Sequence, residues 1–204
     1  GPVTALIELS SKEVMAEIRL PYEVLEDNIE KGALEQHVMR LVAAQAALDF
    51  EDWVLNAQIG GGGDAYMQLT DGLLAQATLH TNNNLNAGFT PDSVEASLLL
   101  MPQKYLRNLA GLKHFVPTAD VIRYRGNVAR RSTGYGDSSL TTNNELIAYG
   151  TPIEGAALMP ANTGLFTFPK NAIFGIQRDI QMETDRDIRS RELVFVLTAR
   201  IDIL

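Results

Sequence analysis

The sequence predicts an α+β fold, and three of its features carry that prediction. An alanine-rich segment at residues 33–56 repeats its large apolar side chains at helical spacing. Alternating polar and apolar residues, typical of half-buried strands, occupy Val14–Leu20 near the start and Arg200–Ile203 at the end. The segments between them contain no internal repeat and no βαβ frame of the kind that builds a dinucleotide-binding sheet.

The first third of the chain is expected to form an extended strand followed by two helices. Residues 7–20 read as a strand, and Pro21 can open a short helix over 22–29 because the first helical position needs no N–H group. Gly32 interrupts that helix. The long helix over 33–56 would then extend roughly 36 Å, at 1.5 Å per residue.

Four consecutive glycines, Gly60–Gly63, follow the long helix and are expected to form a flexible linker. A phosphate-binding loop is the alternative for such a run. That site needs Gly-Lys-Ser/Thr at the start of the next helix, whereas Asp64-Ala65-Tyr66 stands here. The linker is therefore the favoured interpretation.

The remaining elements are short, and strands dominate the end of the chain. Apolar or β-branched runs predict strands over 97–101, 121–125, 147–153 and 165–168. Helices are expected over 69–81 and 103–112, with a short helical or turn segment at 92–96. Gly134–Asp137 reads as a loop. At the end, strands are expected over 173–177, 180–183 and 193–204, with a charged loop at 185–191.

Composition excludes several classes of protein. The 204 residues are 46% apolar and 21% charged, which suits a globular core. The absence of cysteine excludes a disulfide scaffold, a thiolate metal site and a cysteine nucleophile. The net charge of −8 argues against a dedicated nucleic-acid binder, and no apolar run reaches the ~20 residues of a membrane span.

No residue constellation predicts catalysis or a cofactor. The histidines His37, His80 and His114 have no histidine or acid at a metal-binding spacing, and a Gly-x-Ser-x-Gly elbow is absent. A Ser-His-Asp triad assembled through space remains open, because triads are not read from spacing. The favoured interpretation is a non-enzymatic protein without cofactor or metal.

Two arginine clusters are candidates for intersubunit contact. The first comprises Arg123, Arg125, Arg130 and Arg131. The second alternates signs within one predicted loop and comprises Asp185, Arg186, Asp187, Arg189 and Arg191. A solvated, self-compensating surface would explain each cluster equally well. The functional alternative is ion pairing between subunits, for which the bidentate fork of arginine is well suited.

Several short motifs follow one another in a distinctive order. Leu20-Pro21 precedes the long helix, Leu98–Pro102 and Tyr105-Leu106 come later, Tyr149–Ile153 follows, and Phe174-Gly175 with Arg186-Asp187 lie near the end. This order resembles the major capsid proteins of tailed bacteriophages, which share the Hong Kong 97-type shell fold. The likeness extends over nearly the whole chain and depends on order and pattern rather than on one specific motif.

The resemblance implies a domain layout. Residues 1–60 would form the peripheral domain with its spine helix, residues 61–172 the axial domain, and residues 173–204 the strands and loop that return to the peripheral domain. Asp185–Arg191 would match the loop that meets neighbouring subunits at local threefold axes. Some family members cross-link a lysine to an asparagine of that loop, and this loop contains no asparagine.

The start of the chain is expected to lack the family's N-terminal arm and most of its extended hairpin. Gly1-Pro2 is typical of what tag-removing proteases leave behind, and maturation cleavage in the host is the rival explanation.

The resemblance implies a structural protein of the virion, assembled in the host cytoplasm into an icosahedral shell around double-stranded DNA. Its expected partners are further copies of itself in hexamers and pentamers, together with scaffolding and portal proteins. DNA would be held only by enclosure, and no membrane would be involved. The alternatives are an encapsulin-like nanocompartment shell and, from another class, a small-molecule enzyme with an unrecognised site.

Overall fold

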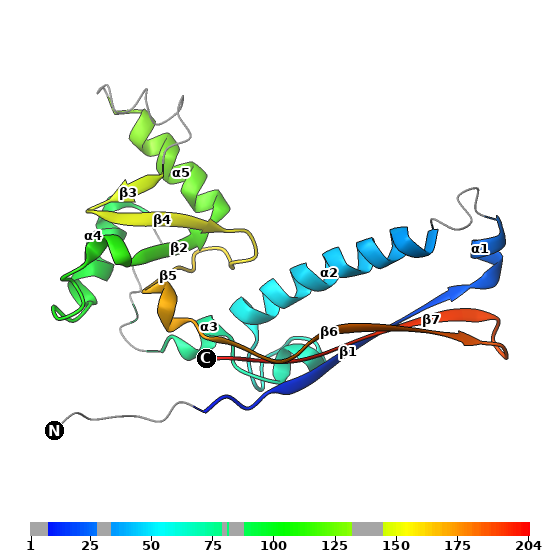
Figure 1. The fold of residues 1–204 in the computed structure, drawn as a ribbon. Coiled ribbons are helices and arrows are strands. Elements are labelled where there is room, and N and C mark those ends of the chain that lie inside the picture. Colours follow the sequence, from blue (N-terminus) through cyan, green and yellow to red (C-terminus); the bar gives the residue numbers. More distant parts are fainter. Residues whose placement is uncertain (1–7, 28–33, 79–80, 82–87, 132–144) are drawn as a thin grey trace. The chain divides into compact units, whose positions relative to one another are not determined.

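The computed structural model describes residues 8–27, 34–78, 81, 88–131 and 145–204, which form two compact units (Figure 1). Unit 1 comprises Gly1–Gly72 and Ile173–Leu204, and unit 2 comprises Leu73–Ala172. The helices are α1 (Tyr22–Asp27), α2 (Leu34–Asn56), α3 (Leu73–Gln76), α4 (Pro91–Leu100) and α5 (Thr118–Ala129). The strands are β1 (Lys12–Pro21), β2 (Lys113–Pro117), β3 (Leu146–Ala148), β4 (Thr151–Ala156), β5 (Leu165–Thr167), β6 (Phe174–Asp187) and β7 (Glu192–Ile203).

Unit 1 contains a three-stranded antiparallel sheet in the order β1-β7-β6. Strand β7 lies in the centre, and its alternate side chains are buried from Leu193 through Ile203. The register pairs Val14 with Ala199 and Ile18 with Phe195, so the apolar side chains of β1 share one face with those of β7. This two-residue period is what the C-terminal alternation predicts.

The end of α2 is held by a loop that folds back on it. Trp53 is 1% exposed, and its indole N–H donates to the backbone oxygen of Tyr66 at 3.0 Å. Gly72 donates its backbone N–H to the oxygen of Ala57 at 2.7 Å, and a Cβ at Gly72 would lie 2.9–3.0 Å from backbone atoms of Val54, Leu55 and Ala57. Only glycine permits this approach. The tetraglycine Gly60–Gly63 lies inside this closed loop of unit 1.

Unit 2 contains a four-stranded mixed sheet in the order β3-β4-β2-β5, in which β2 and β4 are parallel. Helices α4 and α5 contribute to one core with three of these strands. Its buried members are Phe89, Val94, Val116, Tyr124, Val128, Leu146, Ala148 and Ile153.

The α+β class is confirmed, as are the elements with strong local patterns. The long helix begins at Leu34 and ends at Asn56, as the alanine-rich repeat predicts. The final strand, β7, and the short strand β5 occupy their predicted places. The predicted loop at Gly134–Asp137 lies outside the described residues.

Two predicted strands are helices. Ser97–Leu100 continues α4, whose start is fixed by a capping box: Thr90 and Ser93 exchange side-chain hydrogen bonds with each other's backbone N–H, and Pro91 occupies the first position. Val121–Arg125 belongs to α5, where Asp120, Tyr124 and Val128 are buried at four-residue spacing. This spacing fits the helical period of about 3.6 residues, and it outweighs the strand preference of the β-branched residues in the run.

Other expected elements are shorter or divided. The helix predicted over 103–112 is replaced by turns and a 3₁₀ segment, Leu109–Gly111. The helix over 69–81 reduces to α3 because Gly72 packs against α2. Residues 147–153 divide into β3 and β4 around Tyr149 and Gly150, which both have positive φ.

His114 is a buried base in β2 of unit 2. It is 3% exposed and stacks on Phe166, with ring centroids 4.0 Å apart. Its Nε2 has no hydrogen-bond partner among the described residues, and burial lowers the pKa of His114 from 6.5 to about 4.

This shift predicts that unit 2 loses stability in mild acid. The unfolded chain takes up a proton near pH 6.5, whereas folded His114 resists it until about pH 4. Stability is therefore fully present above pH 6.5 and falls by about 3 kcal/mol as the pH drops to 4. Thermal unfolding of the wild type and His114→Phe across this range should show a shallower pH dependence in the variant. Parallel curves would contradict the prediction.

Candidate assembly interface

The predicted contact residues lie at the turn that joins β6 to β7. Asp185, Arg186 and Asp187 are the last residues of β6, paired with Val194, Leu193 and Glu192 of β7. The prediction of one loop over 185–191 is therefore wrong for its first three residues. Strand β6 lies at the edge of the sheet and its side chains here are largely exposed, so their charges do not oppose strand formation.

The acids of this hairpin tip bind backbone groups rather than the neighbouring arginines. Asp187 Oδ1 accepts hydrogen bonds from the N–H of Arg189 at 2.9 Å and of Ser190 at 3.4 Å. A hydrogen bond from the Ser190 side chain, together with these two, lowers the pKa of Asp187. Asp185 Oδ1 accepts from the N–H of Arg186 at 2.7 Å. The acids thus shape the turn.

The turn is also tied to the start of α1. Arg191 has a φ of 56°, and its backbone oxygen accepts a hydrogen bond from the N–H of Tyr22 at 2.9 Å. Arg19 of β1 lies 2.6 Å from Glu17 and 3.7 Å from Glu192. The backbone of the hairpin tip is therefore fixed by contacts within unit 1.

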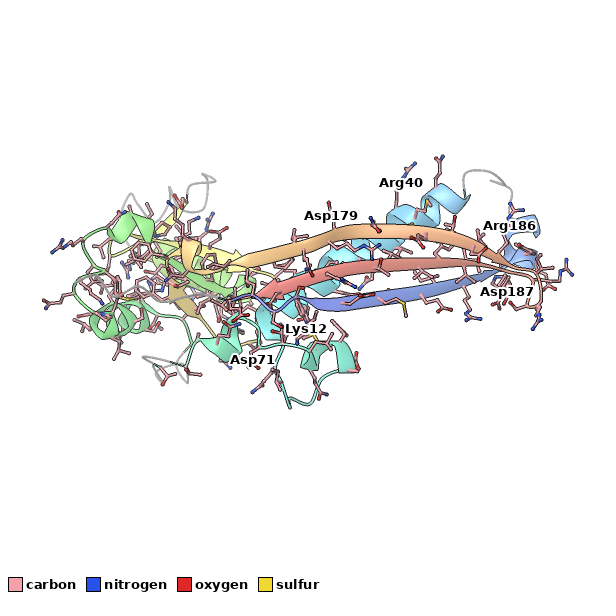
Figure 2. All side chains as sticks on the ribbon, turned by 60° about the horizontal axis from the view of Figure 1, so that its bottom comes forward. Lys12, Arg40, Asp71, Asp179, Arg186 and Asp187 are labelled. Carbon is pink, nitrogen blue, oxygen red and sulfur yellow. The ribbon has the colours of Figure 1, made fainter. Side chains whose placement is uncertain are left out.

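The three arginine side chains of the tip are available to another molecule. Arg186, Arg189 and Arg191 are exposed, and no ion pair involves them within the described part of the chain. Ile188, between them, is 85% exposed. Figure 2 shows Arg186 and Asp187 at one end of the long sheet, with Lys12 toward its other end. A guanidinium in this position can form a bidentate pair with a carboxylate of a neighbour.

The first arginine cluster lies on α5 instead of on the predicted strand. Arg123 pairs with the buried carboxylate of Asp120 at 3.2 Å. Arg130 and Arg131 are exposed at the end of the helix. The structure therefore separates the two clusters into different units.

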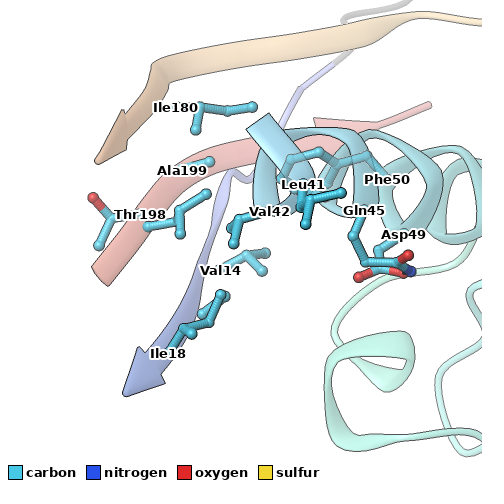
Figure 3. Close-up of a pocket in the computed structure, with 13 residues that line it drawn as sticks. Val14, Ile18, Leu41, Val42, Gln45, Asp49, Phe50, Ile180, Thr198 and Ala199 are labelled. Atoms are coloured by element: carbon cyan, nitrogen blue, oxygen red, sulfur yellow. The ribbon is translucent and has the colours of Figure 1, made fainter. Parts of the chain in front are cut away.

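A groove between α2 and the sheet of unit 1 was not predicted, because only pairing across the chain creates it. Figure 3 shows Leu41 and Val42 of α2 facing Val14, Ile18 and Ile180 of the sheet. The groove encloses about 460 Å³. Its lining residues are Val14, Ala16, Ile18, Leu41, Val42, Gln45, Ala46, Asp49, Phe50, Ile180, Leu197, Thr198 and Ala199. A single carboxylate, Asp49, offers no acid/base couple.

Within the part of the chain that the structure describes, no group of three or more histidine, cysteine, aspartate or glutamate side chains could hold a metal ion. No helix within the described ranges is long and apolar enough to cross a membrane.

Comparison with known proteins identifies relatives over nearly the full chain. No protein-family model matches. The prophage capsid protein YqbE of Bacillus subtilis (strain 168) is 34% identical over 213 residues, covering 98% of this chain and 68% of that protein.

Solved structures share the fold at low sequence identity. A chain of the satellite phage P4 procapsid matches with a TM-score of 0.68 and 12% identity over 98% of this chain and 70% of that one. The SrpI encapsulin of Synechococcus elongatus matches with a TM-score of 0.59 and 9% identity over 95% and 69% of the respective chains. The fold is shared with both the phage procapsid and the encapsulin, whereas the 34% sequence identity is to a phage-type capsid protein. This chain therefore belongs to the family of phage capsid proteins, has the Hong Kong 97-type fold, and is a structural component of the capsid shell.

Proposed function

We propose that the chain is the major capsid protein of a tailed phage or prophage, and that it forms the hexamers and pentamers of an icosahedral shell around double-stranded DNA. The observation that carries this proposal is its 34% identity to a prophage capsid protein along 98% of the chain. Assembly would occur in the host cytoplasm with scaffolding and portal proteins.

The domain assignment is part of the proposal. Residues 1–60 and 173–204 would form the peripheral domain, and residues 61–172 the axial domain. The division of the chain into two compact units supports two domains, but the first boundary differs: residues 61–72 lie in unit 1, and the chain passes to unit 2 after Gly72.

The hairpin tip, Asp185–Arg191, is proposed as the contact between subunits at threefold axes. Its three exposed arginines, which form no ion pair among the residues that the structure describes, support this role, as does the large exposed aliphatic side chain of Ile188. Around a symmetry axis an ion pair between subunits is repeated in every copy, so a small stabilisation per pair adds up to a large one in a shell.

Electron microscopy of particles produced from the whole capsid protein tests the proposal. We expect closed icosahedral shells, filled with DNA when the packaging machinery is present. Shells that instead retain a co-purified enzyme would favour the encapsulin-like compartment. A monodisperse monomer at every protein concentration would reject a shell function.

The net charge of −8 predicts that the isolated chain binds duplex DNA weakly. Non-specific binding depends on neutralising phosphates, so the dissociation constant should be roughly 10⁻⁴ M or weaker at physiological salt. A gel-shift titration at about 150 mM salt measures it. Sub-micromolar affinity would contradict enclosure as the means of holding DNA and would direct attention to the arginines of α5.

A further inference from the structure

An exposed face of α4 in unit 2 is acidic and has a large aliphatic side chain at its centre. Leu99 is 77% exposed, and Glu95 lies one helical turn before it on the same face. The Tyr149 hydroxyl is 3.5 Å from the Glu95 carboxylate, and its ring is half exposed beside the helix. Asp92 adds a second exposed carboxylate in the first turn. We call Asp92, Glu95, Leu99 and Tyr149 the α4 surface.

An exposed face of α5 is basic and, like the α4 surface, has a large exposed aliphatic side chain at its centre. Ile122 is 67% exposed, and Gly126, one turn further along the helix, has open space where a side chain would stand. Arg123 precedes Gly126 by three residues and Arg130 follows it by four, so both lie near it on the helix surface. Arg130 forms no ion pair with any residue that the structure describes. We call Ile122, Arg123, Gly126 and Arg130 the α5 surface.

Both surfaces expose aliphatic area that folding leaves uncovered. Helices α4 and α5 pack on the same core through Val94, Tyr124 and Val128, and they lie apart in unit 2 (Figure 1). Leu99 and Ile122 therefore lie on the outer faces of their helices, where burial would remove apolar area from water.

Charge decides how two copies can meet through these faces. A contact that joined two α4 surfaces or two α5 surfaces would bring Glu95 to Glu95 or Arg130 to Arg130. A head-to-tail contact places the acidic surface of one copy on the basic surface of the next. Repetition of such a contact about one axis closes a ring.

We propose that the α5 surface of one copy binds the α4 surface of the next copy. In this contact Leu99 lies beside Ile122 and Gly126, and Arg130 pairs with Glu95. The inference rests on the proposed shell function and identifies the surfaces that would join neighbouring copies within a ring. DNA is a poorer occupant, because it would cover only the basic α5 surface and leave the acidic α4 surface exposed.

Paired cysteines test the contact directly, because the chain contains no cysteine of its own. The whole capsid protein carrying Leu99→Cys and Ile122→Cys should form, on oxidation, a ladder of disulfide-linked species beyond the dimer on a non-reducing gel. Each single variant should stop at the dimer. A matched control joins Ile122→Cys to Ile147→Cys, since Ile147 is 51% exposed but points to the sheet face opposite Leu146 and Ala148. That pair should give no ladder.

Charge reversal provides a second measurement in the same cysteine background. Glu95→Arg or Arg130→Glu should each reduce the ladder by about tenfold, and the two together should restore it.

The outcomes separate this inference from the proposed function. Closed shells without a ladder overturn the contact and leave the shell function intact. A ladder without shells supports the contact and counts against the shell. If neither shells nor a ladder form, both the contact and the shell function are overturned. If the double charge reversal does not restore the ladder and Arg130→Glu abolishes DNA binding, the α5 surface is assigned to nucleic acid and the contact is overturned.

Discussion

Replacing Arg186, Arg189 and Arg191 by glutamate is expected to prevent shell formation while leaving unit 1 folded. The three side chains are exposed and form no ion pair within the described residues, so their replacement breaks no ion pair there. The backbone of the tip is held by Asp187 and by the hydrogen bond from Tyr22, which the substitutions leave in place. The melting temperature should change by only about a few degrees.

In the assembled shell the same change reverses charge at every equivalent contact. An exposed pair contributes only about 0–1 kcal/mol, but pairs at a symmetric interface recur in each copy and are partly desolvated. We expect the yield of closed shells in electron micrographs to fall by at least about tenfold.

A matched triple, Arg40, Lys104 and Arg107 to glutamate, makes the same change in net charge at three other exposed positions. It should assemble normally if the effect belongs to the hairpin tip. A second variant with glutamine at 186, 189 and 191 removes the cations without adding repulsion and should also reduce the yield. Wild-type yield in the glutamate variant, or an unfolded monomer, would contradict this account of the tip.

Trp53→Ala is expected to destabilise unit 1 by about 3–5 kcal/mol. The side chain is 1% exposed, so its removal leaves a cavity at the end of α2. It also removes the indole N–H that holds the backbone oxygen of Tyr66. The loop from Ala57 to Gly72 should then open, which chemical denaturation followed by circular dichroism and hydrogen exchange at Gln58 will measure.

Two variants on the same helix separate the contributions. Trp53→Phe retains most of the apolar volume but loses the N–H donor, and should cost about 1–3 kcal/mol. Leu48→Ala removes a side chain that is 50% exposed, and should cost about 1 kcal/mol or less. Equal losses for Trp53→Ala and Leu48→Ala would show that the loop is not anchored through the indole.

The structure also explains why some local patterns misled sequence interpretation. The run Ser97–Met101 is apolar enough for a strand, but the capping box at Thr90 and Ser93 starts a helix that extends through Leu100. The capping pattern was present in the sequence and was the informative signal. In α5 the four-residue spacing of Asp120, Tyr124 and Val128 was equally visible, and the β-branched Val121-Ile122 obscured it.

The sequence by itself determined the elements whose signals are local: the α+β class, the long helix α2, the strand β7 and the charged character of the β6–β7 turn. Helical and strand periods depend on residues close together in the sequence, so they can be recognised without knowledge of the fold.

Only the tertiary structure decided which of these elements meet and which charges stay unpaired. Strands β1 and β7 pair across almost the whole chain, as Lys12 opposite Ile201 shows, and the groove beside α2 exists only because of that pairing. A mixed-sign run such as 185–191 allows the acids to neutralise the arginines or to bind backbone N–H groups. The turn geometry selects the second use for Asp185 and Asp187, and Arg186, Arg189 and Arg191 then have no ion pair among the residues that the structure describes. Hydrogen-bond partners depend on three-dimensional position rather than on order in the chain, so spacing alone could not reveal that choice.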